Sequence, residues 1–128
     1  MSEPRFLTLD EVLYLHEESL RRFGGSSGVR DLGLVSSALG SAQNTYFYGY
    51  GNMFDIAAAY AFHIAESQAF IDGNKRTAAA AAAAFLTVNG LPFPKDDGSV
   101  YAAMMQIANK QLDKPGLAEV LRKLVQTA

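Results

Sequence analysis

The chain has 128 residues, of which 49% are hydrophobic, so it can bury one ordinary core and we expect a single domain over residues 1–128. Its 11 basic and 13 acidic residues form no polybasic run, which argues against direct binding of nucleic acid. The lack of cysteine excludes a disulfide framework and a thiolate metal site. Residues 1–6 lack the apolar core of a signal peptide, and no apolar run reaches the roughly 20 residues of a membrane span, so we expect a soluble cytoplasmic protein.

The first half of the chain predicts two helices and an irregular segment. Thr8 and Glu11 have the spacing of a capping box, and Gly24-Gly25 predicts the end of the helix that follows. Its predicted buried face carries Leu9, Leu13, His16, Leu20 and Phe23. Asp31 is a good N-cap for a second helix from Leu32 to about Ala42. In residues 44–52, tyrosine, phenylalanine and glycine alternate without a helical period, which predicts an aromatic loop or a short hairpin.

The second half predicts four more helices. The third runs from near Phe54 or Asp55 to about Ser67, and the fifth follows an Asp97 cap and ends near Asn109. Lys114-Pro-Gly116 is expected to separate a last helix from Leu117 to about Val125.

The fourth predicted helix, roughly Lys75 to Val88, is rich in alanine and ends at Asn89-Gly90. Alanine favours helix and lets neighbouring helices approach closely, so we expect this helix to be central and enclosed on every side. No segment has the pattern of a strand. The predicted fold is therefore an all-α, compact bundle of about six helices around a central alanine-rich helix.

Candidate site residues precede and begin the alanine-rich helix. A helix N-terminus presents unpaired N–H groups to an anion, and Gly73 permits a tight turn beside it. Asn74 can donate hydrogen bonds, Lys75 adds charge and Arg76 can bind two phosphate oxygens at once. Asp72 suits a divalent cation such as Mg²⁺, which prefers one or two carboxylates together with phosphate oxygens. The residues alone equally allow a solvated surface loop in which Asp72 caps the helix.

The segment Phe70-x-Asp72-Gly-Asn-Lys-Arg-Thr77, followed by an alanine-rich helix and Asn89-Gly90, resembles the Fic/Doc family, and its Doc (death on curing) branch in particular. Further matches are Leu7-Thr-Leu-Asp-Glu-Val12, Arg22-Phe-Gly-Gly25 and Gly28-Val-Arg-Asp-x-Gly-Leu34. The resemblance implies the toxin of a toxin–antitoxin pair. Doc-type chemistry moves the terminal phosphoryl of a nucleotide such as ATP onto a hydroxyl of elongation factor Tu and arrests translation.

The resemblance also implies roles for single residues. Phe70 corresponds to a core anchor and Asp72 to the Mg²⁺ ligand, and the phosphate and cofactor binders correspond to Gly73, Asn74, Lys75, Arg76 and Thr77. The adenylyltransferase branch has glycine at the position of Lys75 and usually a second arginine at the position of Ala79, which favours the Doc branch here.

The family's catalytic histidine falls on Gln68. Glutamine does not titrate near neutral pH and cannot take a proton from the target hydroxyl, a contribution worth roughly 10²–10⁴ in rate. We therefore expect binding to survive and turnover to be impaired. His63 lies one and a half helical turns away and is not expected to replace the histidine, and both His63 and His16 are expected to be hydrogen-bonded within the helix packing.

Several alternatives stay open from the sequence. Gln68 is either a deliberate inactivation of a toxic enzyme or a natural loss in a member that keeps a nucleotide or partner site. The chain could instead be a Fic-type adenylyltransferase or a non-catalytic binding module. The aromatic segment Tyr46–Tyr50 either docks the target as an added strand, as the resemblance implies, or covers an edge of the core. The resemblance further implies an antitoxin whose disordered tail folds as a helix in a groove.

Overall fold

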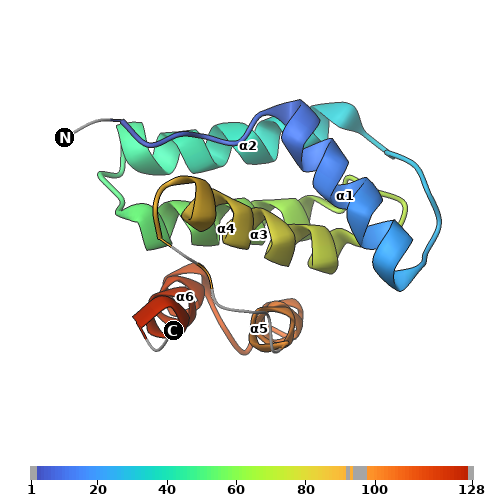
Figure 1. Ribbon diagram of the computed structural model, residues 1–128. Coiled ribbons are helices and arrows are strands. Elements are labelled where there is room, and N and C mark those ends of the chain that lie inside the picture. Colours follow the sequence, from blue (N-terminus) through green and yellow to red (C-terminus); the bar gives the residue numbers. More distant parts are fainter. Residues whose placement is uncertain (1–2, 92, 94–97, 127–128) are drawn as a thin grey trace.

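The computed structural model describes residues 3–91, 93 and 98–126, and this part of the chain forms six α-helices and no strand (Figure 1). The helices are α1 (Leu9–Phe23), α2 (Leu32–Phe47), α3 (Met53–Ser67), α4 (Asn74–Val88), α5 (Ser99–Ala108) and α6 (Lys114–Gln126). The predicted all-α class is confirmed. Within the described residues, no helix is both long and apolar enough to cross a membrane.

Helices α3 and α4 lie side by side in the middle of the bundle (Figure 1). α2 packs against α3, and α1 crosses over α4. α5 and α6 cover the opposite side and are seen nearly end-on, so they run across the direction of α3 and α4. Buried apolar side chains from all six helices form the core.

The helix ends follow the local chemistry of the sequence. At the start of α1, the Glu11 N–H donates to Thr8 Oγ1 at 3.1 Å and the Thr8 N–H donates to Glu11 Oε1 at 2.9 Å, which is the predicted capping box. Asp31 caps α2 by accepting a hydrogen bond from the Leu34 N–H. Asn89 is the C-cap of α4, as predicted.

The aromatic segment is more helical than predicted. α2 continues through Phe47, and α3 begins at Met53, where Asn52 Oδ1 accepts a hydrogen bond from the Asp55 N–H. Residues 48–51, the aromatic turn, lie between these two helices and are not helical. The rings of Tyr46 and Phe47 pack against the ring of Phe6, which lies near the N-terminus. Tertiary packing therefore stabilises a helical conformation here, although the local sequence pattern does not predict one.

The start of the last helix also differs from the prediction. Lys114, Pro115 and Gly116 form the first turn of α6 and do not separate it from the preceding segment. Asp113 Oδ1 accepts a hydrogen bond from the Gly116 N–H at 2.8 Å, and proline is tolerated in a first turn, where its missing N–H would have no helical partner. The predicted cap of α5, Asp97, lies outside the described residues, and α5 begins at Ser99.

The alanine-rich helix is central but is not enclosed all round. Ala78, Ala81 and Ala82 have no exposed surface, as expected for close packing between helices. Ala80 and Ala83 are partly exposed and line a cavity between α1 and α5. The prediction of complete enclosure is therefore wrong on this side of α4.

Candidate functional site

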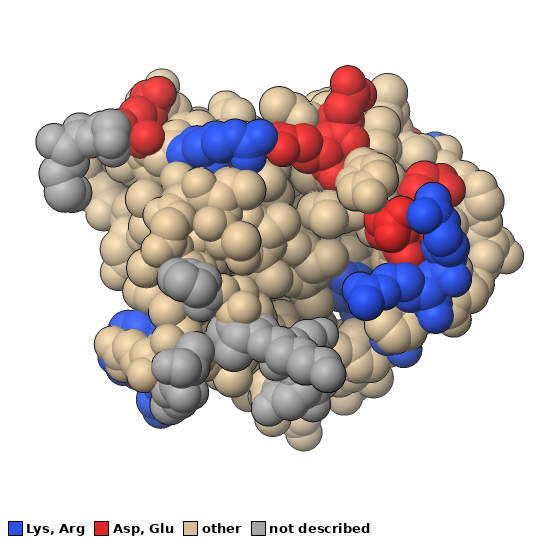
Figure 2. All heavy atoms as spheres, viewed as in Figure 1, with Lys and Arg blue, Asp and Glu red and all other residues tan. Residues whose placement is uncertain are grey.

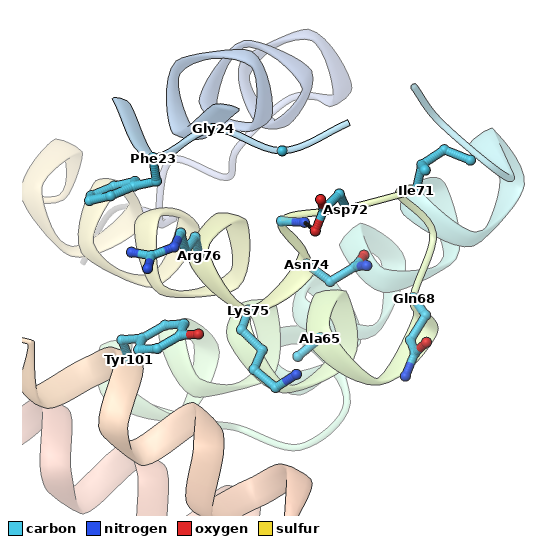
Figure 3. A pocket seen from close by; sticks show the side chains of 12 residues that line it. Phe23, Gly24, Ala65, Gln68, Ile71, Asp72, Asn74, Lys75, Arg76 and Tyr101 are labelled. Atoms are coloured by element: carbon cyan, nitrogen blue, oxygen red, sulfur yellow. Dashed lines mark hydrogen bonds between the residues drawn. The ribbon is translucent and has the colours of Figure 1, made fainter. Parts of the chain in front are cut away.

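A cavity of about 390 Å³ lies at the N-terminus of α4, where the loop after α3 meets the ends of α1 and α5 (Figure 3). The residues predicted for the site line it together: Gln68, Asp72, Gly73, Asn74, Lys75 and Arg76. Its lining is mainly polar, with the two cations on one side and Asp72 on the other (Figure 3). The loop before α4 therefore borders a cavity at this point.

The N-terminus of α4 opens into this cavity without a side-chain cap. The residue at the N-cap position is Gly73, whose backbone has φ 78° and ψ 21°, a left-handed conformation that suits glycine. The first N–H groups of an α-helix have no intrahelical partner and lie at the positive end of its dipole. This end of α4 can therefore accept an anion such as a phosphate group.

The Asp72 carboxylate is oriented by two backbone N–H groups. Its Oδ2 accepts from Ser26 at 3.1 Å, and its Oδ1 accepts from Gly73 at 2.9 Å. Gly25 must approach closely to bring Ser26 into place, because a Cβ atom at Gly25 would lie 2.9 Å from Asp72 Oδ2. The loop after α1 thus fixes the direction of this carboxylate.

The buried side of the loop that precedes α4 is fixed by His16 and Phe70. His16 stacks on the Phe70 ring with 3.9 Å between centroids and 14° between planes. Its Nε2 lies 2.8 Å from the Asp72 carbonyl oxygen, so this nitrogen carries the proton and donates. Both residues are buried, which confirms that Phe70 is a core anchor and that His16 is a hydrogen-bonded core histidine.

Arg76 is held between two aromatic rings at the edge of the cavity (Figure 3). The centre of its guanidinium group lies 4.0 Å from the Phe23 ring centroid and 4.6 Å from the Tyr101 ring centroid. Each contact is a cation–π interaction that fixes the orientation of the planar guanidinium while its N–H groups remain donors. Phe23 does not lie on the buried face of α1 as predicted; it is 58% exposed and covers Arg76.

Asn74 lines the cavity and also braces the loop before α4, whereas Thr77 does not line the cavity. The Asn74 side chain braces the loop, since its Oδ1 accepts from the Phe70 N–H at 3.1 Å and its Nδ2 donates to the Phe70 carbonyl at 3.0 Å. The second Nδ2 hydrogen of Asn74 and its backbone N–H remain for a ligand. Thr77 is fully buried and does not line the cavity, because its position on the first turn of α4 faces the core.

Gln68 ends α3 in a left-handed conformation with φ 49° and ψ 42°. Its side chain is exposed at the edge of the cavity, and its carbonyl accepts a hydrogen bond from the Arg30 guanidinium. His63 faces away from the site, with its Nε2 3.0 Å from Lys114 Nζ on α6. Burial, and then the neighbouring Lys114 charge, lower the pKa of His63. His63 therefore does not take the place of the missing histidine.

The aromatic turn of residues 48–51 does not border this cavity. It precedes α3, whereas the cavity lies beyond the other end of that helix, about 22 Å away for a helix of 15 residues at 1.5 Å each. Tyr46 packs into the core edge, while Tyr48 and Tyr50 are exposed. The structure thus does not place Tyr46–Tyr50 in the lining of the cavity, and Tyr46 covers a core edge, as in the alternative interpretation.

The contacts of Asp72 allow it to help hold a divalent cation. Each carboxylate oxygen accepts one backbone hydrogen bond, which leaves further lone pairs for a cation. The described residues contain no cluster of three metal-binding side chains. The geometry therefore fits Mg²⁺ held jointly by Asp72 and ligand phosphates, and it does not provide a cage made by the protein alone.

The structure defines an all-α bundle with a polar cavity, lined by Lys75, Arg76 and Asp72, at the start of its central helix. Comparison with known proteins identifies the family: the chain belongs to the Fic/DOC family, whose profile matches residues 6–86. It is 39% identical over 104 residues to the Toxin Doc of Mycolicibacterium smegmatis, covering 77% of this chain and 79% of that protein. It is 29% identical over 125 residues to the Protein kinase doc of Escherichia phage P1, covering 97% of this chain and 98% of that protein.

Sequence reasoning missed the residues that reach the site from distant segments. Phe23 and Tyr101 hold Arg76, Ser26 orients Asp72, and Arg30 binds the Gln68 carbonyl. Gly24-Gly25 predicts the end of α1, but nothing in the local sequence predicts that Gly25 lies close to Asp72. No local pattern marks Tyr101, because its role depends on how α5 crosses α4.

Proposed function

We propose that this chain is a Doc-like toxin scaffold that binds ATP or another nucleotide by its phosphates at the N-terminus of α4. The observation that carries the proposal is the cavity in which Lys75, Arg76 and the uncapped end of α4 face Asp72. A triphosphate with Mg²⁺ presents to such a site both the negative charge that the cations favour and the divalent cation that Asp72 suits. One of the two relatives is named a toxin and the other a protein kinase, and both names support the proposal of a Doc-like toxin scaffold.

The reaction proposed is transfer of the terminal phosphoryl of the nucleotide to a hydroxyl of elongation factor Tu, which would arrest translation. In the family this step uses a histidine as general base, at the position occupied here by Gln68. Gln68 can hydrogen-bond a hydroxyl but cannot accept its proton near neutral pH. We therefore propose that the chain binds nucleotide and transfers phosphoryl poorly.

The test compares the chain with its Gln68→His variant, using ATP labelled on the γ-phosphate and elongation factor Tu. Histidine is one of the residues that tolerate the left-handed backbone found at Gln68, so the substitution should not strain the loop. We expect transfer to rise by roughly 10²–10⁴ in the histidine variant. Adding Arg76→Ala to that variant should abolish the gain. A histidine variant that binds nucleotide but remains inert would contradict the kinase proposal.

Gln68 itself favours a second candidate, a non-catalytic module that keeps the nucleotide or partner site. This candidate predicts calorimetric ATP binding that depends on Arg76, with no labelled product in any variant. Transfer of an α-phosphate label would instead indicate the adenylyltransferase, against which Lys75 and Ala79 argue.

The partner proposed for this toxin is an antitoxin whose disordered tail folds as a helix in a groove of this chain. A small reading frame directly beside this one, whose product co-purifies with the chain, would support that partner. If the product of that frame does not bind, the toxin–antitoxin part of the proposal fails while nucleotide binding is judged separately.

A further inference from the structure

The loop between α1 and α2 runs antiparallel to the loop that joins α3 to α4. Residues 28–30 pair with residues 69–71 through an isolated antiparallel bridge and backbone hydrogen bonds, of which the bond from the Arg30 N–H to the Ala69 carbonyl is 2.7 Å long. These bonds use main-chain atoms, so they remain when a side chain in this pairing is changed. The backbone pairing therefore brings the Arg30 side chain beside the end of α3.

The Arg30 side chain makes a contact that the backbone pairing does not require. Its guanidinium group donates a hydrogen bond to the carbonyl of Gln68, the residue that ends α3. Arg30 is exposed and forms no ion pair within the part of the chain that the structure describes. The last carbonyls of a helix lack N–H partners within it and lie at the negative end of its dipole, where a cation is favourable. Arg30 therefore ties down the C-terminal end of α3.

The backbone of Gln68 needs such support. Its φ of 49° and ψ of 42° are left-handed, a conformation that residues with a Cβ atom rarely adopt and keep only where their surroundings hold them. The next two residues, Ala69 and Phe70, are 1% and 2% exposed, so the core fixes the chain on that side. The Arg30 bond fixes the Gln68 carbonyl on the exposed side. Because the backbone conformation sets the direction of the Cβ atom, it also decides where the side chain of residue 68 meets the cavity (Figure 3).

We propose that Arg30 is a positioning residue, which holds the Gln68 carbonyl and thereby fixes the side chain of residue 68 at the edge of the cavity. The consequence for catalysis rests on the proposed function, because position 68 is where phosphoryl transfer would need its general base. Arg30 itself does not line the cavity. It therefore acts on the reacting groups through residue 68 and leaves the phosphate-binding residues unchanged.

The first test measures the mobility of residue 68 by NMR and needs no activity, so it uses the chain with its Gln68. We expect the backbone order parameter of Gln68 to fall from about 0.85, the value of a rigid backbone, to below about 0.6 in Arg30→Ala. Arg30→Lys should retain much of the order, because an ammonium group can still donate to the carbonyl. Arg21→Ala is the matched control: Arg21 is an exposed arginine of α1 that pairs with Glu18, and its loss should leave residue 68 unchanged.

The second test measures phosphoryl transfer in the Gln68→His variant, in which residue 68 can act as the base. Adding Arg30→Ala should lower kcat about 10–100-fold, the size of loss expected for a displaced catalytic group, and should leave the KM for ATP unchanged. Adding Arg30→Lys instead should recover most of kcat. Circular dichroism gives the folded fraction of each variant, so that kcat is expressed per folded molecule and a loss of stability is not mistaken for a loss of positioning.

The outcomes separate this inference from the proposed function. An unchanged order parameter at residue 68 in Arg30→Ala would overturn the inference, and so would an unchanged kcat when Arg30→Ala is added to an active Gln68→His variant. If Gln68→His binds ATP but transfers no phosphoryl, the kinase proposal fails, and the order parameters alone then decide whether Arg30 holds residue 68.

Discussion

His16 is the residue through which α1 positions the loop that carries Asp72. The histidine uses both of its chemical properties, since its ring stacks on Phe70 and its Nε2 donates to the Asp72 carbonyl. Because the carboxylate of the same Asp72 faces the cavity, a change at His16 acts on the site without touching a ligand.

Replacement of His16 by phenylalanine should separate these two properties. Phenylalanine keeps an aromatic ring against Phe70 but cannot donate to the Asp72 carbonyl, so we expect the free energy of unfolding to fall by about 1 kcal/mol. ATP should also bind more weakly, because the Asp72 loop is less fixed. Urea denaturation and calorimetry measure the two effects. Tyr14→Phe, at an exposed position of the same helix, is the control, and an unfolding midpoint for His16→Phe equal to that of the control would contradict the prediction.

Some residues of the site could be predicted from the sequence, and others could be identified only from the structure. Asp72 to Arg76 are consecutive at the start of a predicted helix, so the sequence was sufficient to place them together. It was not sufficient to show that the Asn74 amide is engaged by the Phe70 backbone, nor that Thr77 faces the core. The contacts of Asn74 and the burial of Thr77 depend on the backbone conformation of the loop before α4. Tyr101 reaches the site only through packing between helices that are distant in sequence.

At the scale of helices, the thinness of α4 decides how closely its neighbours approach. The side chains of Ala78, Ala81 and Ala82 have no exposed surface, whereas the opposite side of the helix borders cavities. The two sides of one alanine run should therefore respond differently to the same substitution.

Ala81→Leu places a larger side chain where the core has no space, so we expect destabilisation of about 1–3 kcal/mol. Ala84→Leu adds the same atoms beside a cavity of about 290 Å³ between α1 and α4 and should change stability much less. Thermal unfolding of the two variants gives the comparison. Equal losses in both would show that helix packing around α4 is as tight on one side as on the other, contrary to the structure.

Helix boundaries were predictable where local capping decides them and less so where distant packing does. Thr8, Asp31 and Asn89 mark their helix ends by chemistry that involves only near neighbours. The end of α2 depends on the contact of Tyr46 and Phe47 with Phe6, which no local pattern reveals. The predicted start of α6 at Leu117 is too late, because Pro115 lies in the first turn of the helix, where proline is compatible with helical structure.

At the scale of the whole molecule, the segment before α1 is tied to the middle of the bundle at two points. The Asn89 side chain accepts from the Arg5 N–H at 2.8 Å and donates to the Arg5 carbonyl at 2.9 Å, joining residues 84 positions apart. The buried Tyr60 hydroxyl accepts from the Leu7 N–H at 2.9 Å. These bonds link the beginning of the chain to α3 and to the end of α4, so they stabilise the fold as a unit.

The Tyr60 bond should make the stability of the fold sensitive to alkaline pH. Burial raises the pKa of Tyr60 from its ordinary value of 10.0 to about 12. The unfolded chain therefore releases this proton at a lower pH than the folded chain. The stabilisation linked to this group is fully present below about pH 10 and is lost as the pH rises from 10 to about 12.

Tyr60→Phe should reveal this dependence by removing the group that titrates. At pH 7 the variant should be less stable by about 1–3 kcal/mol, because the buried Leu7 N–H loses its acceptor. Between pH 10 and 12, however, its stability should fall less steeply than that of the unmodified chain, so the difference between the two proteins narrows. Urea denaturation across this pH range measures both effects. Tyr50→Phe is the control, since Tyr50 is 91% exposed and its removal should leave the alkaline slope unchanged. A constant difference between Tyr60→Phe and the unmodified chain from pH 7 to 12 would mean that Tyr60 ionises alike in the folded and unfolded states.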